Sequence, residues 1–199
     1  MLRSGAAYVS AAEILIARYE RADPLRVHAH ALHLIPAEPR RALDIGAGTG
    51  RDAAWLAGMG HDVVAVEPTA PFREAGAKLH PSPRIEWVDD MLPDLAVLGD
   101  RAPFEMIFAT AVWMHLDEAE RMCGMARLAQ LAADDALIFM LLRHGPVPEG
   151  RVMFEVSGEE TIALARPYGF APVVCEARAS LQDDAPSDVH WTALALKRG

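Results

Sequence analysis

The sequence predicts an α/β protein in which a mainly parallel sheet carries helices on both faces. From residue 41 onward, short apolar runs alternate with segments of helical periodicity. The apolar runs contain almost no polar residues, which is typical of parallel strands buried on both faces. The first of them ends in a glycine-rich turn that leads directly into a helix over 51–59.

Five strands are expected in the alternating part of the chain, at 42–45, 63–66, 85–88, 106–110 and 136–142. The helices between them have recognisable starts. Thr69 followed by Pro71 suits the first turn of one helix. Asp117 with Glu120, and Ser157 with Glu160, form the pattern of a capping box.

The last part of the chain departs from this alternation. Two further strands, at 170–177 and 190–196, are joined by a loop over 181–188. A loop of that length does not make a parallel crossover, so the final strand is expected to run antiparallel. Asp183 and Asp184 predict that this loop is acidic and solvated.

The N-terminal part, up to about residue 34, is predicted to be helical. One helix covers 11–19 and a shorter one follows Pro24, before two prolines interrupt the pattern. His28, His30 and His33 invite comparison with a metal site, but no cysteine or acid with ligand spacing accompanies them. We therefore expect no metal, and a plain surface or lid helix instead.

Composition narrows the class of protein. The chain has 199 residues, 52% of them hydrophobic, and this suits a single globular domain. A formal net charge of −9 without a basic cluster argues against nucleic acid and favours a small-molecule substrate. No apolar run reaches the roughly 18 residues that a membrane span needs, and no secretory signal is evident. Cys123 and Cys175 lack metal spacing, which suggests buried or inert thiols and a cytoplasmic location. A monomer and a homodimer both remain open.

The glycine turn predicts a ligand of the nucleoside type. Gly46, Gly48 and Gly50 let the backbone turn sharply and approach a ligand closely, and the helix that follows offers free N–H groups. Dinucleotide enzymes use a Gly-x-Gly-x-x-Gly spacing, which this turn lacks because position 51 is arginine. Asp44, just before the turn, would repel a pyrophosphate and suits a cofactor with a cationic group.

Acids also end the next two strands. Glu67, after the second strand, suits both hydroxyls of a ribose. Asp89, Asp90 and Met91 follow the third strand, where a carboxylate can accept from an adenine amino group and the methionine can pack on the ring.

Together these elements resemble a class I S-adenosylmethionine-dependent methyltransferase, and within that class small bacterial enzymes of undefined substrate. The matching segments are 43–50, 66–68, 89–91 and 108–116. The resemblance implies a Rossmann-like three-layer sandwich with a seven-stranded, mostly parallel sheet whose last strand is antiparallel. It also implies a helical lid over 1–38 and a core over 39–199 within one domain.

The same resemblance implies roles for individual residues. The residues expected to bind S-adenosylmethionine are Asp44, Gly46, Ala47, Gly48, Glu67, Pro68, Asp89 or Asp90, Met91, Thr110, Ala111 and, from the N-terminal helices, Tyr8, with Tyr19 beside it. Asp90 is favoured over Asp89 for the adenine amine, although a shortened segment leaves that register open.

Methyl transfer from a sulfonium is an in-line displacement, so a general base is needed only if the acceptor arrives protonated. His115, after the fourth strand, is the candidate base, and shaping the pocket is its alternative role. Arg143 and His144 end the fifth strand, where open α/β sheets bind ligands, and could orient the substrate. Trp113 could form a wall of the pocket.

Two other functions stay open at this point. A non-catalytic binder of S-adenosylmethionine would carry the same cofactor residues. An NAD(P)-dependent oxidoreductase would share the fold, but Asp44 and Arg51 disfavour a dinucleotide.

Overall fold

The computed structural model describes residues 3–99, 101, 103–181 and 187–199. Within these residues, seven strands form one sheet in the order β3-β2-β1-β4-β5-β7-β6. Their bounds are β1 Arg41–Ile45, β2 Asp62–Val66, β3 Ile85–Val88, β4 Phe104–Thr110, β5 Ala132–His144, β6 Phe170–Ala179 and β7 His190–Arg198. The pairs from β3 to β5 are parallel, whereas β7 runs antiparallel to both β5 and β6. The predicted sheet and its antiparallel last strand are confirmed.

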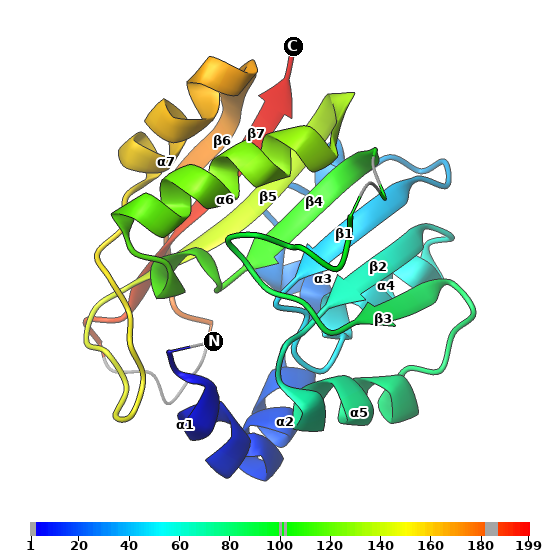
Figure 1. Cartoon of the computed structure of the whole chain (residues 1–199), viewed down its shortest axis with the longest axis vertical. Coiled ribbons are helices and arrows are strands. Elements are labelled where there is room, and N and C mark those ends of the chain that lie inside the picture. Colours follow the sequence, from blue (N-terminus) through cyan, green and yellow to red (C-terminus); the bar gives the residue numbers. More distant parts are fainter. Residues whose placement is uncertain (1–2, 100, 102, 182–186) are drawn as a thin grey trace.

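Helices cover both faces of this sheet, which makes three layers (Figure 1). On one face lie α6 (Glu118–Leu131) and α7 (Gly158–Ala165), and on the other α3 (Pro24–Val27) and α4 (Arg51–Gly58). The remaining helical segments are α1 (Gly5–Ser10), α2 (Ala12–Glu20), η1 (Leu32–Leu34), α5 (Ala70–Leu79), η2 (Trp113–His115) and η3 (Arg166–Tyr168). The N-terminal helix predicted over 11–19 is α2, and α1 precedes it.

The central strands are buried on both faces, as their apolar sequences predict. Leu43 and Ile107 belong to the core beneath α6, whereas Ala42 and Phe108, on the opposite side of the same strands, pack toward α4. The ring of Phe108 stacks on that of Phe139, with centroids 4.6 Å apart. This double core fixes the strand ends from which the functional site is built.

The two predicted capping boxes have different outcomes. Asp117 accepts from the N–H of Glu120, and the Glu120 carboxylate accepts from the N–H of Asp117, so this box is complete. Ser157 accepts from the N–H of Glu160 at 3.0 Å. The Glu160 carboxylate accepts from Arg121 instead, so only half of the second box forms.

Some expectations about single residues were wrong. His28 is not a surface residue but is 1% exposed, since it lies between α4 and the sheet. Cys123 and Cys175 are exposed rather than buried, and both are free. Asp183 and Asp184, in the predicted acidic loop, lie outside the described residues. None of the described helices is long and apolar enough to cross a membrane.

Candidate active site

A cavity of about 1000 Å³ opens at the carboxyl ends of the central strands. Its lining comes from the turns after β1, β2, β3 and β4, from the end of β5, and from α1 and α2. Figure 1 shows α1 and α2 beyond the lower ends of the strands, next to the start of α5. The carboxyl edge of an open α/β sheet is the usual place for a ligand, so this cavity is the candidate site.

The glycine turn forms the part of the cavity at the carboxyl end of β1. Gly46 and Gly48 have φ of +66° and +58°, in the left-handed region that favours glycine. A Cβ on Gly46 would lie 2.4 Å from Cγ2 of Val112, and one on Gly48 would lie 3.4 Å from the Tyr19 ring. The N–H of Ala47 donates to the carbonyl of Val66, which holds the turn against β2. Val112 thus leaves no room for a side chain at Gly46, whereas at Gly48 the positive φ is what favours glycine.

Glu67 connects the turns after β1 and β2. Its buried carboxylate accepts from the N–H of Gly48 at 2.9 Å and from the N–H of Thr69 at 2.7 Å. Burial raises the pKa of Glu67, and these bonds oppose the rise. Thr69 precedes α5 as predicted, but its side chain makes no capping bond. The carboxylate therefore lines the cavity in a fixed position.

Asp44 has a buried carboxylate that lacks a full set of partners. Its Oδ2 has no hydrogen-bond partner within the described residues, although the residue is only 2% exposed. Burial, followed by the charge of nearby Asp52, raises the pKa of Asp44 well above its usual range. An unpaired buried oxygen in a cavity wall is costly unless a ligand supplies a donor. A cationic N–H group suits this position.

Asp52, in the first turn of α4, is fully compensated by contrast. Its carboxylate accepts from Nε2 of His28 at 2.9 Å and from Nε of Arg51 at 2.8 Å. Burial would raise the pKa of Asp52, but His28 and Arg51 hold it well below its usual range. The His28 ring also stacks on Trp55. Asp52 thus anchors α3 to α4, and the uncompensated carboxylate is that of Asp44.

Of the two acids after β3, the structure places Asp90 in the cavity wall. Its carboxylate accepts from the N–H groups of Met91, Val97 and Leu98 at 2.7 to 3.1 Å, which folds the loop after β3 around it. Asp89 points away, pairs with Arg73, and has a side chain that is 65% exposed.

His115 and Tyr8 form a hydrogen-bonded pair in the cavity wall. Nδ1 of His115 lies 2.9 Å from the carbonyl oxygen of Val152, so this nitrogen carries the proton. Nε2 is then an acceptor, and the Tyr8 hydroxyl donates to it at 2.9 Å. Burial, and to a lesser extent the charges of Arg151 and Arg143, lower the pKa of His115. The ring is therefore a neutral base at neutral pH.

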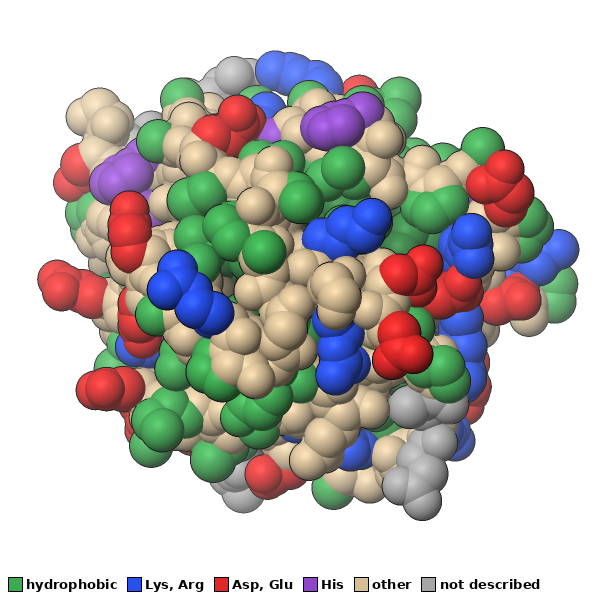
Figure 2. Space-filling view, turned by 90° about the horizontal axis from the view of Figure 1, so that it is seen from above, with side chains coloured by type: hydrophobic (Ala, Val, Ile, Leu, Met, Phe, Trp, Pro, Cys, Tyr) green, Lys and Arg blue, Asp and Glu red, His purple; other side chains and the backbone are tan. Residues whose placement is uncertain are grey.

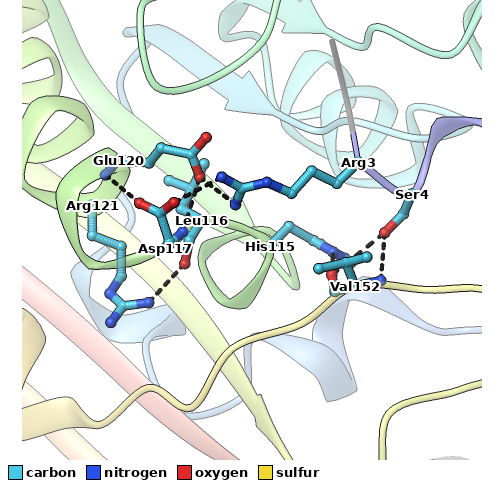
Figure 3. Close-up of polar contacts among 8 residues, drawn as sticks. All are labelled: Arg3, Ser4, His115, Leu116, Asp117, Glu120, Arg121 and Val152. Atoms are coloured by element: carbon cyan, nitrogen blue, oxygen red, sulfur yellow. Dashed lines mark hydrogen bonds and ion pairs between the residues drawn. The ribbon is translucent and has the colours of Figure 1, made fainter.

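The N-terminal segment is tied to the start of α6 and to Val152, the residue that contacts His115 (Figure 3). Arg3 donates to Asp117 at 2.7 Å and to Glu120 at 2.8 Å, both at the start of α6. Ser4 accepts from the N–H of Val152 at 2.9 Å, on the same residue that fixes His115. These contacts hold α1 against the loop after β5, so that Tyr8 faces the cavity.

The structure brings most of the predicted site residues together. Those that line the cavity are Tyr8, Tyr19, Asp44, Gly46, Ala47, Gly48, Glu67, Pro68, Asp90, Met91, Thr110, Ala111, His115 and Arg143. Three do not line it. Asp89 faces Arg73, Trp113 lies in the core and is 0% exposed, and His144 bonds to Thr192 and stacks on His190. Trp113 lies beyond β4 and His144 is the last residue of β5, as expected, but neither side chain lines the cavity.

Several lining residues were missed by the sequence reading. Arg18, Arg151, Arg178 and Trp191 come from α2, the loop after β5, β6 and β7. None of them lies in a recognisable motif, and their sequence separation gives no signal. Folding of the two C-terminal strands beside β5 brings them to the same cavity.

The comparisons with known proteins agree with this geometry. Residues 42–135 match the model of the family described as methyltransferase domain. No curated protein matches the chain. Among solved structures, the 1,6-didemethyltoxoflavin N1-methyltransferase of Burkholderia thailandensis, with its ligand and S-adenosylhomocysteine bound, is 20% identical with a TM-score of 0.66, and the match covers 100% of this chain and 91% of that one. The magnesium protoporphyrin IX methyltransferase of Synechocystis PCC 6803, with S-adenosylmethionine bound, is 16% identical with a TM-score of 0.67, over 87% and 77% of the chains. The N-methyltransferase NodS of Bradyrhizobium japonicum WM9, in complex with S-adenosylhomocysteine, is 13% identical with a TM-score of 0.64, over 80% and 78%.

These structures show that the fold is the Rossmann-like fold of methyltransferases. The unpaired Asp44 oxygen, the bare glycine turn and the acid after β2 fit S-adenosylmethionine, whose amino group, methionine backbone and ribose need such partners. The family match over 42–135, the segment that carries these residues, supports the assignment of the chain to the class I S-adenosylmethionine-dependent methyltransferases.

Proposed function

We propose that this methyltransferase acts on a small-molecule acceptor inside the cavity, with Asp44 as the main electrostatic anchor of the cofactor. The observation that carries the proposal is the buried Asp44 oxygen without a partner at the start of the glycine turn. The amino group of S-adenosylmethionine is a cation with N–H donors, and it matches both the charge and the missing hydrogen bond.

The other cofactor contacts follow from the order of the strands. Gly46, Ala47 and Gly48 lie against the methionine part and the ribose, and Glu67 with Pro68 holds the ribose hydroxyls. Asp90 and Met91 bind the adenine above β3. Thr110 and Ala111, at the end of β4, border the sulfonium. All of these residues line the same cavity.

The bound sulfonium supplies an activated methyl group, so the protein contributes mainly alignment and exclusion of water. The N-terminal helices serve as a lid in this proposal. Tyr8 and Tyr19 reach the cavity from α1 and α2, and both pack edge-on against Phe72 of α5. The ties of Arg3 and Ser4 to α6 and Val152 would hold this lid in place.

The Tyr8–His115 pair would remove a proton from an acceptor that arrives protonated. The Tyr8 hydroxyl already donates its proton toward Nε2 of His115, so its oxygen is free to accept one from the acceptor. One proton passes from the acceptor to Tyr8 while the Tyr8 proton passes to His115. Burial raises the pKa of Tyr8, which keeps this hydroxyl protonated between turnovers.

Two observations support a small acceptor. The cavity is lined by α1 and α2, and the Burkholderia thailandensis enzyme described above has both 1,6-didemethyltoxoflavin and S-adenosylhomocysteine bound. Figure 2 shows acidic and basic side chains interspersed on the face seen from above, with no continuous basic patch among the residues coloured there.

The free thiols of Cys123 and Cys175 support a reducing, cytoplasmic location. A monomer or a homodimer would suit this function equally.

Titration calorimetry and a labelled methyl group test the proposal. The protein should bind S-adenosylmethionine and S-adenosylhomocysteine with dissociation constants below about 1 mM, the weak end of specific affinity. Incubation with methyl-labelled cofactor and a fractionated pool of metabolites should move the label into a small product. Label found in protein or nucleic acid, and none in small molecules, would contradict the proposed acceptor class.

A further inference from the structure

The half of the cavity that lies away from the glycine turn is lined by arginines. Arg143 ends β5, Arg178 lies near the end of β6, and Arg151 belongs to the loop after β5. The opposite half carries the acids Asp44, Glu67 and Asp90. The cavity is therefore polarised, with carboxylates beneath the predicted cofactor and guanidinium groups where an acceptor would enter.

The register of the sheet places two of these arginines on either side of an aromatic residue. Arg143 of β5 pairs with Trp191 of β7, and Trp191 pairs in turn with Arg178 of β6. Directly paired residues of antiparallel strands point to the same face. All three side chains line the cavity, so they form a row of cation, indole and cation along its wall.

The charges in this half are not neutralised by the protein. Within the described residues, no carboxylate forms an ion pair with Arg143, Arg151 or Arg178. The polar contact of the Arg143 guanidinium is with Sδ of Met153 at 4.0 Å. Burial, followed by the charges of Arg151 and Arg18, lowers the pKa of Arg143, and the charge of Asp188 offsets only part of this effect.

Arg143 and Arg151, the two arginines nearest His115, differ from Arg178 in their contacts with the rest of the protein. Arg178 donates to the carbonyls of Val27 and Arg26, which fixes it in the fold. Arg151 lies over the ring of Tyr8, 4.6 Å from its centroid. An anion held by Arg143 and Arg151 would thus lie beside the Tyr8–His115 pair.

We propose that the methyl acceptor is a small organic acid whose carboxylate binds between Arg143 and Arg151, with Trp191 as the apolar wall beside it. A carboxylate satisfies the fork of a guanidinium and removes the repulsion between the cations. The inference rests on the proposed small-molecule function and adds the charge of the acceptor.

The position of the row of Arg143, Trp191 and Arg178 indicates that the anion it binds belongs to the acceptor and is not the carboxylate of the cofactor. Neighbouring strands lie roughly 4.8 Å apart, and β4 separates β5 from the glycine turn of β1. The acids at the ends of β1, β2 and β3 account for the amino group, ribose and adenine, so the cofactor extends from β4 toward β3. Arg143 and Trp191 lie on the far side of β4.

Three probes that differ only in charge test the inference: benzoate, benzamide and benzylamine. Each is titrated into the protein saturated with S-adenosylhomocysteine, for the wild type, Arg143→Met, Arg151→Met and the control Arg84→Met, whose side chain pairs with Asp62 away from the cavity. Benzoate should bind the wild type and the control at least ten times more tightly than benzamide, and benzylamine least. Arg143→Met and Arg151→Met should each bind benzoate at least ten times more weakly than the wild type does. Their affinity for S-adenosylhomocysteine should stay within about twofold of the wild-type value.

The inference is overturned if benzoate binds the wild type no better than benzamide does. It is also overturned if Arg143→Met and Arg151→Met both keep the wild-type affinity for benzoate. An equal loss of S-adenosylhomocysteine affinity in Arg143→Met would overturn it as well, because the arginine would then hold the cofactor's carboxylate. Failure of the wild type to bind S-adenosylhomocysteine would instead remove the proposed function. Thermal melting of each variant checks the fold, and the second arginine variant carries the test should one of them not fold.

Discussion

Replacing Asp44 with asparagine should weaken cofactor binding and leave the fold intact. Oδ2 of Asp44 has no hydrogen-bond partner in the described part of the chain, so its contribution to binding is a contact with the ligand. A hydrogen bond to a charged group contributes roughly 1.5–3 kcal/mol. Because about 1.4 kcal/mol corresponds to a tenfold change, Asp44→Asn should raise the dissociation constant for S-adenosylmethionine by about 10- to 100-fold.

The free protein should respond in the opposite sense. A buried carboxylate with an unpaired oxygen opposes folding, and its neighbour Asp52 adds repulsion. Asparagine has the same shape and no charge, so the melting temperature of Asp44→Asn should be unchanged or higher. Calorimetric titration and thermal melting are compared with Asp134→Asn, which alters an exposed acid of β5 away from the cavity. A lower melting temperature with unchanged affinity would refute the reasoning, since Asp44 would then act in the fold alone.

The same carboxylate predicts how affinity depends on pH. Burial raises the pKa of Asp44 in the free protein. A bound ammonium group favours the ionised carboxylate, so a proton is released on binding wherever Asp44 is protonated beforehand. Affinity should therefore fall as the pH decreases through this raised pKa, and the slope should vanish in Asp44→Asn. A slope that persists in the variant would assign the effect to another group.

Three further predictions concern the surroundings of the cavity. Nδ1 of His115 should carry the proton in the neutral ring, and the pKa of the ring should lie below 6.5 because the ring is buried. Nitrogen NMR measures both the tautomer and the pKa, and a pKa above 6.5 would contradict the assigned geometry. Gly46→Ala should lower the free energy of unfolding by about 2–5 kcal/mol in urea titrations, because the left-handed backbone is strained with a side chain and because the new Cβ clashes with Val112. Adding Val112→Ala should restore only the part of this loss that the clash causes. Full recovery would show that backbone strain contributes nothing. His28→Leu should cost about 1–3 kcal/mol because Oδ2 of the buried Asp52 loses its hydrogen bond while Arg51 still pairs with Oδ1. His28→Gln should cost less, and equal losses in the two variants would show that packing on Trp55 dominates.

The mainly parallel sheet and its antiparallel last strand could be predicted from the sequence because their signals are local. Apolar runs such as 63–66 had to be buried on both faces, and the short connection after β6 left an antiparallel pairing as the expected outcome. The glycine turn and Asp44 are adjacent in the chain, so the cofactor half of the site could be described before any contact was known.

The acceptor half could not be described in this way. Trp113 lies beyond β4 in η2, where no strand periodicity decides its direction, and packing turns it into the core beneath α6. Arg143 and His144 are neighbours at the end of β5, so their side chains alternate, and only the packing of the sheet decided that Arg143 faces the cavity. His28 is a similar case, since nothing in the sequence pointed to its partner Asp52, which lies 24 positions away.

The sequence by itself determined the class of the enzyme, the turn that meets the cofactor, and the acids that follow the first three strands. These depend on residues that are close in the chain and on strand ends that must meet at one edge of a parallel sheet. The tertiary structure decided which of Asp89 and Asp90 lines the cavity, that Tyr8 is bonded to His115, and that Arg143, Trp191 and Arg178 form one row. Those relations join segments up to more than a hundred residues apart, and only the packing of the helices and the register of the last strands brings them together.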